Sequence, residues 1–331
     1  MLLKKDGIPT YHFAHAIDDH LMRTTTVVRG GEWLASAPIH YELFHLLGFK
    51  MPAYAHTAHL MKFDEETGGK RKLSKRKDPE LSLDYYRKDG YHPYTMKVYL
   101  LTLLNSNFEE WHEKFPDKDI NEFPFSVEKM NQSGALFDKD KLHNICKNEL
   151  SKLSEEELYD FLYDWAKENE PENVEKWFGD REKMLQILRL YMGVGAKRRR
   201  KDLMYAKQIF ELISYFFDGE SAEEMDEFKL DEDMVSKILK SYLAKYDHND
   251  DNSVWFNKLK EIADEHGFAS DMKAYKAKFQ EILREMYLDI AEAVELQLSG
   301  RANTPDLWTI VHIMGEEQMT ERIKSILSNP I

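Results

Sequence analysis

Thr24-Thr25-Thr26-Val27-Val28-Arg29-Gly30-Gly31 sets the architecture of the N-terminal part of this chain. Its β-branched run and the two glycines that follow predict a buried strand that ends in a turn. A helix is expected next, because Pro38 suits a first helical position and Gly48 suits the residue after a helix end. The segment from Tyr54 to Leu60 predicts a second strand, parallel to the first with a right-handed crossover. Residues 24–60 therefore predict a βαβ unit.

The chain from about Leu81 onward is predicted to be helical nearly throughout. Ser154 and Glu157 are spaced as a capping box. Apolar stripes at helical spacing are found over residues 158–166, 184–192 and 234–242. A long helix is expected over residues 271–298, a further helix start at Thr304-Pro305-Asp306, and loops at residues 105–123 and 247–253. The predicted fold class is mainly α with an N-terminal α/β part, in which an incomplete Rossmann-like parallel sheet precedes helical domains.

Composition excludes several classes of protein. The net charge of −14 argues against wholesale wrapping of nucleic acid, because an acidic envelope repels phosphate. The longest apolar runs fall far short of the ~20 residues that span a bilayer. Cys146 is the only cysteine, so no internal disulfide can form. We therefore expect a cytoplasmic protein with no membrane segment and no signal peptide.

Two basic clusters stand out against this acidic background, residues 70–77 and residues 197–201. For either cluster alone, a solvated surface is the simpler interpretation. The first cluster has more internal structure. Two glycines precede it, and Lys72, Ser74 and Lys75 can aim two ammonium groups and a hydroxyl at one polyphosphate. Such a loop can close over ATP and compensate the charge that builds as pyrophosphate leaves.

A metal site is an alternative use for the N-terminal histidines, of which seven fall within residues 1–60. His56 and His59 lie on the predicted second strand, where residues three apart point to opposite faces of a sheet. No cysteine ligand accompanies them, although zinc sites need several converging ligands. We therefore predict hydrogen-bonded histidines in or near a cleft, and no bound metal.

Several segments follow one another in an order typical of one enzyme family. The N-terminal ones are Asp6-Gly7-Ile8-Pro9-Thr10-Tyr11-His12-Phe13-Ala14, Val28-Arg29-Gly30-Gly31-Glu32-Trp33-Leu34 and Pro38-Ile39-His40. Lys72-Leu73-Ser74-Lys75-Arg76 comes next and is similar to the second class I synthetase motif, Lys-Met-Ser-Lys-Ser. Later segments are Ser82-Leu83-Asp84-Tyr85-Tyr86, residues 131–142 and residues 299–315. Together they resemble the bacterial glutamyl-tRNA synthetases, which are class I aminoacyl-tRNA synthetases.

The resemblance implies a substrate site near the N-terminus. Tyr11 and Arg29 match residues that hold the glutamate substrate, a role that suits a guanidinium beside a phenol. Glu32 and Trp33 match positions that line the adenosine pocket, where Trp33 offers a flat apolar wall to the base. Core aromatics and a surface ion pair are the alternative interpretations of these residues.

The ATP loop is the second site that the resemblance implies. Lys72, Ser74 and Lys75 match this loop and are the expected catalytic residues, and Lys75 is also expected to bind ATP. Mg²⁺ would accompany ATP as part of the substrate. His15 and Gly31 stand where the family often has asparagine and an acidic residue, so the contacts around the substrate amino group stay open.

The family's domain order implies three regions in this chain. They are the second half of the Rossmann catalytic domain with the ATP loop, a helical stem-contact region and an α-helical anticodon-binding domain, over residues 1–77, 78–150 and 151–331. In the last region, a run of basic residues is expected to meet tRNA phosphate through Arg198, Arg199 and Arg200. The expected partners are tRNA(Glu), glutamate and ATP, and a monomer is expected.

The expected activity is ATP-dependent formation of glutamyl-adenylate and transfer of glutamate to the tRNA 3′ end. The family's other motif, His-Ile-Gly-His, is not found, so we expect an inactive fragment that lacks the first half of the Rossmann domain. One alternative is glutaminyl-tRNA synthetase, whose anticodon region is built from β-barrels. Another is a non-catalytic tRNA-binding fragment. The sequence does not decide whether glutamine tRNA is also charged.

Overall fold

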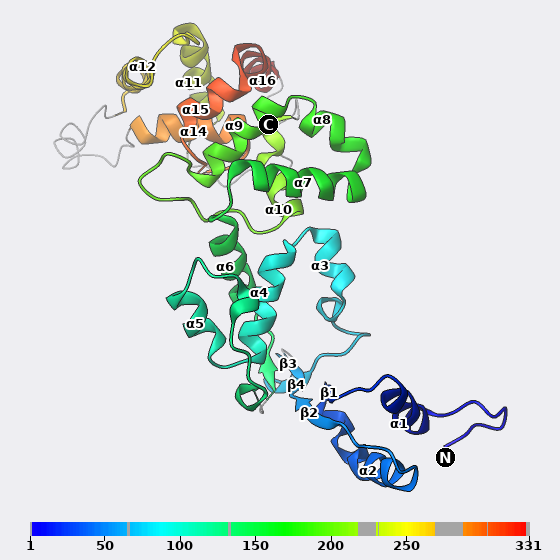
Figure 1. Ribbon diagram of the computed structural model, residues 1–331. Coiled ribbons are helices and arrows are strands. Elements are labelled where there is room, and N and C mark those ends of the chain that lie inside the picture. Colours follow the sequence, from blue (N-terminus) through cyan, green and yellow to red (C-terminus); the bar gives the residue numbers. More distant parts are fainter. Residues whose placement is uncertain are drawn as a thin grey trace. The chain divides into compact units, whose positions relative to one another are not determined.

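The computed structural model describes residues 2–64, 67–131, 134–217, 230, 232–268, 287–302 and 304–328. The chain forms two compact units, Met1–Ile145 and Cys146–Ile331. Helices dominate both units, and every strand among the described residues belongs to the first (Figure 1). None of the described helices is both long and apolar enough to cross a membrane.

The first unit contains the predicted βαβ arrangement. Strands β1 (Thr26–Gly30) and β2 (Ala53–Thr57) pair in parallel, and helix α2 (Ala37–Leu46) connects them. Pro38 lies in the first turn of α2, and Gly48 follows its end at a φ of +67°. The parallel strand–helix–strand unit is therefore confirmed. The predicted extension of the second strand to Leu60 is wrong, because β2 ends at Thr57, opposite the last residue of its partner β1.

A small apolar core holds helix α1 (Tyr11–Leu21) against α2. Its buried residues are Ala16, Leu43 and Phe44. Other apolar side chains of this region stay exposed, among them Val28, Leu34 and Leu46 at 56%, 60% and 72%. Parallel strands are normally covered on both faces, so two strands with this much exposed apolar surface form an incomplete layer.

A second sheet carries the predicted ATP loop. Its strands are β3 (Leu60–Phe63), β4 (Lys70–Lys72) and β5 (Ala135–Leu136), in the order β4-β3-β5. Strand β4 is antiparallel to β3, whereas β5 is parallel to it. The loop begins after β4 at Leu73, which is buried and donates its amide to the carbonyl of Leu60. The sheet thereby anchors the loop at its first residue.

Helices make up the rest of the first unit and lead into the second. They are α3 (Leu83–Asp89), α4 (Pro93–Leu104), α5 (Phe108–Lys114) and α6 (Lys139–Leu150), with 3₁₀ turns η1 (Gly31–Ser36), η2 (Pro79–Leu81), η3 (Ile120–Glu122) and η4 (Val127–Lys129). Val98, Phe108, Ile120 and Phe123 form a buried cluster among them. The loop predicted over residues 105–123 is therefore wrong in part. Asn107 marks the start of α5 rather than a turn, and Phe108 is completely buried.

The second unit has one core to which each of its described helices contributes buried residues. These helices are α7 (Glu155–Asn169), α8 (Val174–Phe178), α9 (Arg181–Met192), α10 (Ala206–Ile213), α11 (Glu232–Lys245), α12 (Asn252–Glu265), α14 (Tyr287–Ser299), α15 (Leu307–Met314) and α16 (Glu316–Ser328), with 3₁₀ turns η5 (Pro171–Asn173) and η6 (Ser214–Phe216). The capping box of Ser154 and Glu157 is confirmed at the start of α7. The predicted stripe over residues 184–192 is also confirmed, because its apolar residues are buried.

Two predicted helices in this unit have different bounds from those of the described helices. The start at Thr304 is wrong, because Asp306 is the N-cap of α15 and accepts the amide of Thr309 at 2.9 Å. Thr304 instead donates to the carboxylate of Glu295. The long helix predicted over residues 271–298 is described only from Tyr287 onward, and its first part lies outside the described residues.

Candidate functional site

Arg29 lies in a cluster of aromatic and imidazole rings at the end of β1. Its guanidinium donates three hydrogen bonds, from Nη1 to Nδ1 of His40 at 2.9 Å, from Nε to Nε2 of His56 at 3.1 Å and from Nη2 to the carbonyl of Trp33 at 3.3 Å. The central carbon of the guanidinium lies over the ring of Tyr54, 4.6 Å from its centroid. Neighbouring elements of the βαβ unit therefore fix the orientation of this side chain.

Tyr11 reaches the same cluster from α1. The centroid of its ring lies 4.3 Å from the ring of Trp33 and 5.7 Å from the ring of His15, on which it stacks. Tyr11 is 46% exposed, so one side of this ring pair is open to a ligand. The structure thus brings together three of the predicted binding residues: Tyr11, Arg29 and Trp33.

The imidazoles around Arg29 are kept uncharged by their surroundings. His40 is completely buried, and burial, with smaller contributions from His15 and Arg29, lowers its pKa to about 4. Burial and the charge of Arg29 also lower the pKa of His56. Burial lowers the pKa of His15 despite the neighbouring carboxylate of Asp19. At neutral pH the cation of this cluster is the guanidinium.

His15 has a structural partner on each side of its ring. Nδ1 lies 2.6 Å from the carboxylate of Asp19, and Nε2 shares a hydrogen bond of 2.7 Å with the hydroxyl of Tyr54. This residue, which stands where the resemblance leads one to expect asparagine, orients the ring that stacks on Arg29.

Glu32 lies between this cluster and the ATP loop. One carboxylate oxygen is 3.7 Å from Nζ of Lys72, and the other is 3.3 Å from Nδ1 of His59. A hydrogen bond from its own backbone, helped by Lys72, lowers the pKa of Glu32.

His59 lies beyond the end of β2, so the prediction that His56 and His59 share one strand is wrong. No group of three or more potential metal ligands occurs in the part of the chain that the structure describes.

The predicted ATP loop, residues 73–77 with Lys72 at the end of β4, is closed at its base by an ion pair. Arg71 donates from Nη1 and Nη2 to the two carboxylate oxygens of Asp78, each at 2.7 Å. The amide of Ser74 donates to the same carboxylate at 2.8 Å. Asp78 is 2% exposed, and the hydrogen bonds from Arg71 hold the pKa of its carboxyl well below its usual range. Lys72 and Lys75 are exposed on this closed turn, and Ser74 is partly buried.

Sequence reasoning missed three residues of these sites, namely His40, Tyr54 and Asp78. For Asp78 a signal was available, because it is the acidic residue that ends the basic run of residues 70–77. For His40 and Tyr54 no spacing rule applies, since their contacts to Arg29 depend on how the strands and α2 pack.

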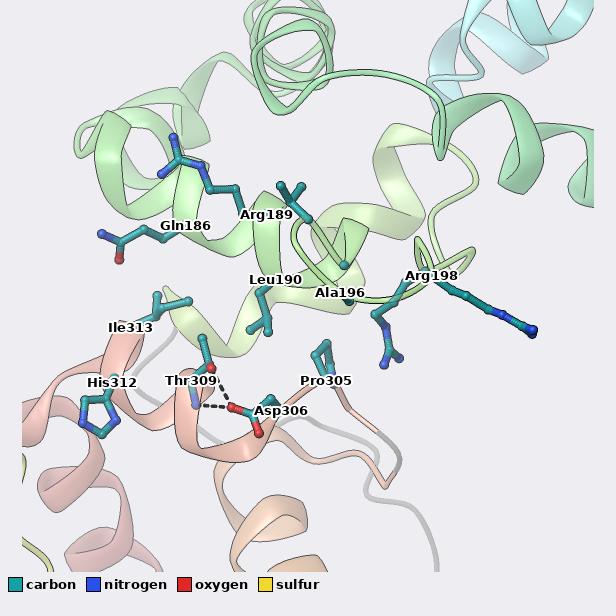
Figure 2. Close-up of a pocket in the computed structure, with 13 residues that line it drawn as sticks. Gln186, Arg189, Leu190, Ala196, Arg198, Pro305, Asp306, Thr309, His312 and Ile313 are labelled. Atoms are coloured by element: carbon teal, nitrogen blue, oxygen red, sulfur yellow. Dashed lines mark hydrogen bonds between the residues drawn. The ribbon is translucent and has the colours of Figure 1, made fainter. Parts of the chain in front are cut away.

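A cavity of about 710 Å³ lies within the second unit (Figure 2). Helix α9 and the loop that follows it form one side, and residues 305–313 form the other. Leu190, Pro305 and Ile313 give the cavity apolar walls, and Arg198 and Arg200 also line it.

The three predicted tRNA-binding arginines have different surroundings. Arg200 donates from Nε to the carboxylate of Asp202 at 2.7 Å. Arg199 is exposed. The pKa of Glu155 is lowered mainly by a hydrogen bond from the backbone of Glu155 and by the hydrogen bond from Arg189, and the charge of Arg199 makes a smaller contribution. Arg198 is exposed at the cavity and forms no ion pair with any residue that the structure describes. The strongest uncompensated charge at the cavity is therefore that of Arg198.

Comparison with known proteins finds one enzyme family to which this chain is similar. Residues 1–144 match the model of the class I tRNA synthetases (E and Q), catalytic domain. The chain is 53% identical to the glutamate–tRNA ligase of Acetivibrio thermocellus and 43% identical to that of Clostridium perfringens, in each case over 99% of this chain and 59% of the relative. The crystal structure of a glutamate tRNA ligase from Elizabethkingia meningosepticum, in complex with its amino acid, shares the fold. Its TM-score is 0.67 at 24% identity, over 99% of this chain and 62% of that one. The chain is therefore similar to glutamate–tRNA ligases over nearly its whole length, and it spans 59% of the length of these two curated relatives.

Proposed function

We propose that this chain supplies the glutamate-binding residues, the ATP loop and the tRNA-contacting helices of a glutamate–tRNA ligase. In the first step a carboxylate oxygen of glutamate attacks the α-phosphate of ATP, so that glutamyl-adenylate forms and pyrophosphate leaves. In the second step a hydroxyl of the 3′-terminal ribose of tRNA attacks the acyl carbon, and AMP leaves.

The observation that carries this proposal is the environment of Arg29. All three of its hydrogen bonds go to uncharged acceptors, and no carboxylate among the described residues pairs with it. A guanidinium has five N–H groups, so two remain for a ligand, one on each terminal nitrogen. A carboxylate can accept both in parallel, which is the strongest geometry available to this pair. Glutamate, with two carboxylates, suits a pocket formed by Arg29 and Tyr11.

The ATP loop is proposed to act on the phosphates of the nucleotide. Lys72 and Lys75 would compensate the charge on the departing pyrophosphate, and Ser74 would hold the loop in its turn. Trp33 would cover one face of adenine, with Glu32 beside it. Mg²⁺ would arrive with ATP and polarise the same phosphates.

The second unit is proposed to bind the anticodon stem or loop of tRNA(Glu). Arg198 would meet a phosphate at the cavity lined by Leu190 and Pro305, with Arg199 and Arg200 alongside. All the described elements of this unit are helical, which does not favour a glutaminyl enzyme with β-barrels in its anticodon region. In this proposal residues 1–77, 78–150 and 151–331 serve as the second half of the catalytic domain, the stem-contact region and the anticodon-binding domain.

A chimera tests the proposed function. This chain would replace the matching 59% of the Acetivibrio thermocellus ligase, with which it shares 53% identity. We expect exchange of labelled pyrophosphate into ATP that requires glutamate and tRNA, and that Arg29→Ala abolishes. A chimera that unfolds cooperatively on heating but shows no glutamate-dependent exchange would contradict the proposal.

A further inference from the structure

We infer that His40 and His56 are positioning residues, which hold the guanidinium of Arg29 in the orientation that selects a carboxylate over an amide. This inference rests on the proposed function and extends it from the residue that binds the carboxylate to the residues that aim it.

The direction of each hydrogen bond follows from the chemistry of Arg29. A guanidinium can only donate, so Nδ1 of His40 and Nε2 of His56 must accept. A neutral imidazole carries a single N–H, which places that of His40 on Nε2. It then donates to Nδ1 of His12, at 2.9 Å. The chain from His12 through His40 to Arg29 therefore has one permitted order of donors and acceptors.

Burial reinforces this order. His40 is completely buried between His12 and Arg29, and its pKa of about 4 keeps it an acceptor at neutral pH. Three of the five donors of Arg29 are then directed into the protein by His40, His56 and the carbonyl of Trp33. The ring of Tyr54 also restricts the guanidinium on one side, since its centroid lies 4.6 Å from the guanidinium carbon.

This arrangement has a consequence for selectivity. Two N–H groups of fixed direction match the two acceptor oxygens of the side-chain carboxylate of glutamate. The amide of glutamine offers one oxygen and presents its own N–H₂ to the second donor, which leaves two donors facing each other. A guanidinium released from His40 or His56 can turn to suit the amide. Removing either acceptor should therefore weaken glutamate binding and relax discrimination against glutamine.

The experiment uses the chimera and two pairs of variants. His40→Leu and His56→Leu remove the acceptors, whereas His40→Asn keeps an acceptor near the position of Nδ1 and His56→Gln keeps one near Nε2. Hydrogen bonds to charged groups are strong enough that each leucine variant should lower kcat/KM for glutamate roughly tenfold to hundredfold. The loss should appear mainly in KM for glutamate, with KM for ATP unchanged. The glutamate-to-glutamine ratio of kcat/KM should fall, and the amide variants should recover most of both losses.

His45→Leu is the matched control, because His45 is exposed on the same helix, α2. It should leave KM for glutamate and the glutamate-to-glutamine ratio unchanged. Absence of exchange in the unsubstituted chimera would contradict the proposed function itself. The present inference would be overturned if the chimera is active and its leucine variants keep both KM for glutamate and the glutamate-to-glutamine ratio. It would also be overturned if the leucine variants raise KM for glutamate and KM for ATP equally and the Asn and Gln variants recover neither. If His40→Leu fails to fold, the partly buried His56 pair decides the matter on the same criteria.

Discussion

At the residue scale, Lys75 lies on the closed turn of the predicted ATP loop as an exposed ammonium that no described residue pairs with. If it stabilises charge on the polyphosphate mainly as the adenylate forms, its loss should affect turnover more than binding. We expect Lys75→Ala in the chimera to lower kcat of pyrophosphate exchange on the order of 10²-fold, with little change in KM for glutamate. Lys77→Ala, two residues along the loop, is the control and should keep near-normal exchange. Near-normal exchange by Lys75→Ala would remove this residue from the mechanism.

Arg198 is the second residue whose role can be isolated. A side chain that neutralises one tRNA phosphate releases about one counterion, so its loss should reduce the slope of log affinity against log salt by about one. We expect Arg198→Ala to show this change in tRNA titrations of the chain. Arg200→Ala should show less of it, because Arg200 already pairs with Asp202. Lys207→Ala removes the same charge from an exposed site on α10 and should leave the slope unchanged. If all three variants keep the slope of the unsubstituted chain, the cluster is only a solvated surface.

Residue identities were easier to predict than residue partners. The sequence indicated Tyr11, Arg29 and Trp33, which the structure brings into one cluster. It did not indicate His40 or Tyr54, which contact Arg29 only because β1 and β2 are adjacent and α2 crosses between them. Contacts of that kind depend on tertiary packing, which spacing along one chain does not contain.

At the scale of elements, the base of the predicted ATP loop should respond to pH. The pKa of Asp78 is lower in the folded protein than its ordinary value of 3.8, so the pair stabilises the loop above that pH. This stabilisation should disappear as the pH falls below about 4 toward the lowered folded-state value. We expect the amide of Ser74 to be protected from hydrogen exchange at neutral pH and to lose protection on acidification.

Asp78→Asn should cause the same loss at neutral pH. A hydrogen bond to a charged group contributes enough that exchange in residues 70–80 should quicken roughly tenfold or more. Asp84→Asn, at an exposed position in the next helix, removes the same charge and serves as the control. Unchanged exchange in Asp78→Asn would show that the sheet, rather than the ion pair with Arg71, holds the loop.

Element types were predictable where the signal was local. The βαβ unit and the capping box at Ser154 are examples, since strand periodicity and cap chemistry act over a few residues. Errors arose where a partner decided the outcome. Strand β2 ends at Thr57 because β1 ends opposite it, and Asp306 replaces Thr304 as a cap because Glu295 binds Thr304. Such partners lie too far along the chain for local rules to find.

At the scale of the whole molecule, the two units differ in how complete their packing is. The second unit has a continuous core drawn from each described helix, whereas the site of the first rests on two parallel strands with exposed apolar residues beside them. A preorganised site loses most of its advantage when the elements that support it are not fixed. We therefore expect the 331-residue chain, assayed by itself, to fold cooperatively in its helical unit and to bind tRNA. It should show no glutamate-dependent exchange of pyrophosphate into ATP, with or without tRNA, under conditions in which the chimera is active. Clear exchange by the chain alone would show that its two strands are enough to hold Arg29 and the predicted ATP loop in working positions. It would then contradict the view that the parallel layer must be extended before the site can act.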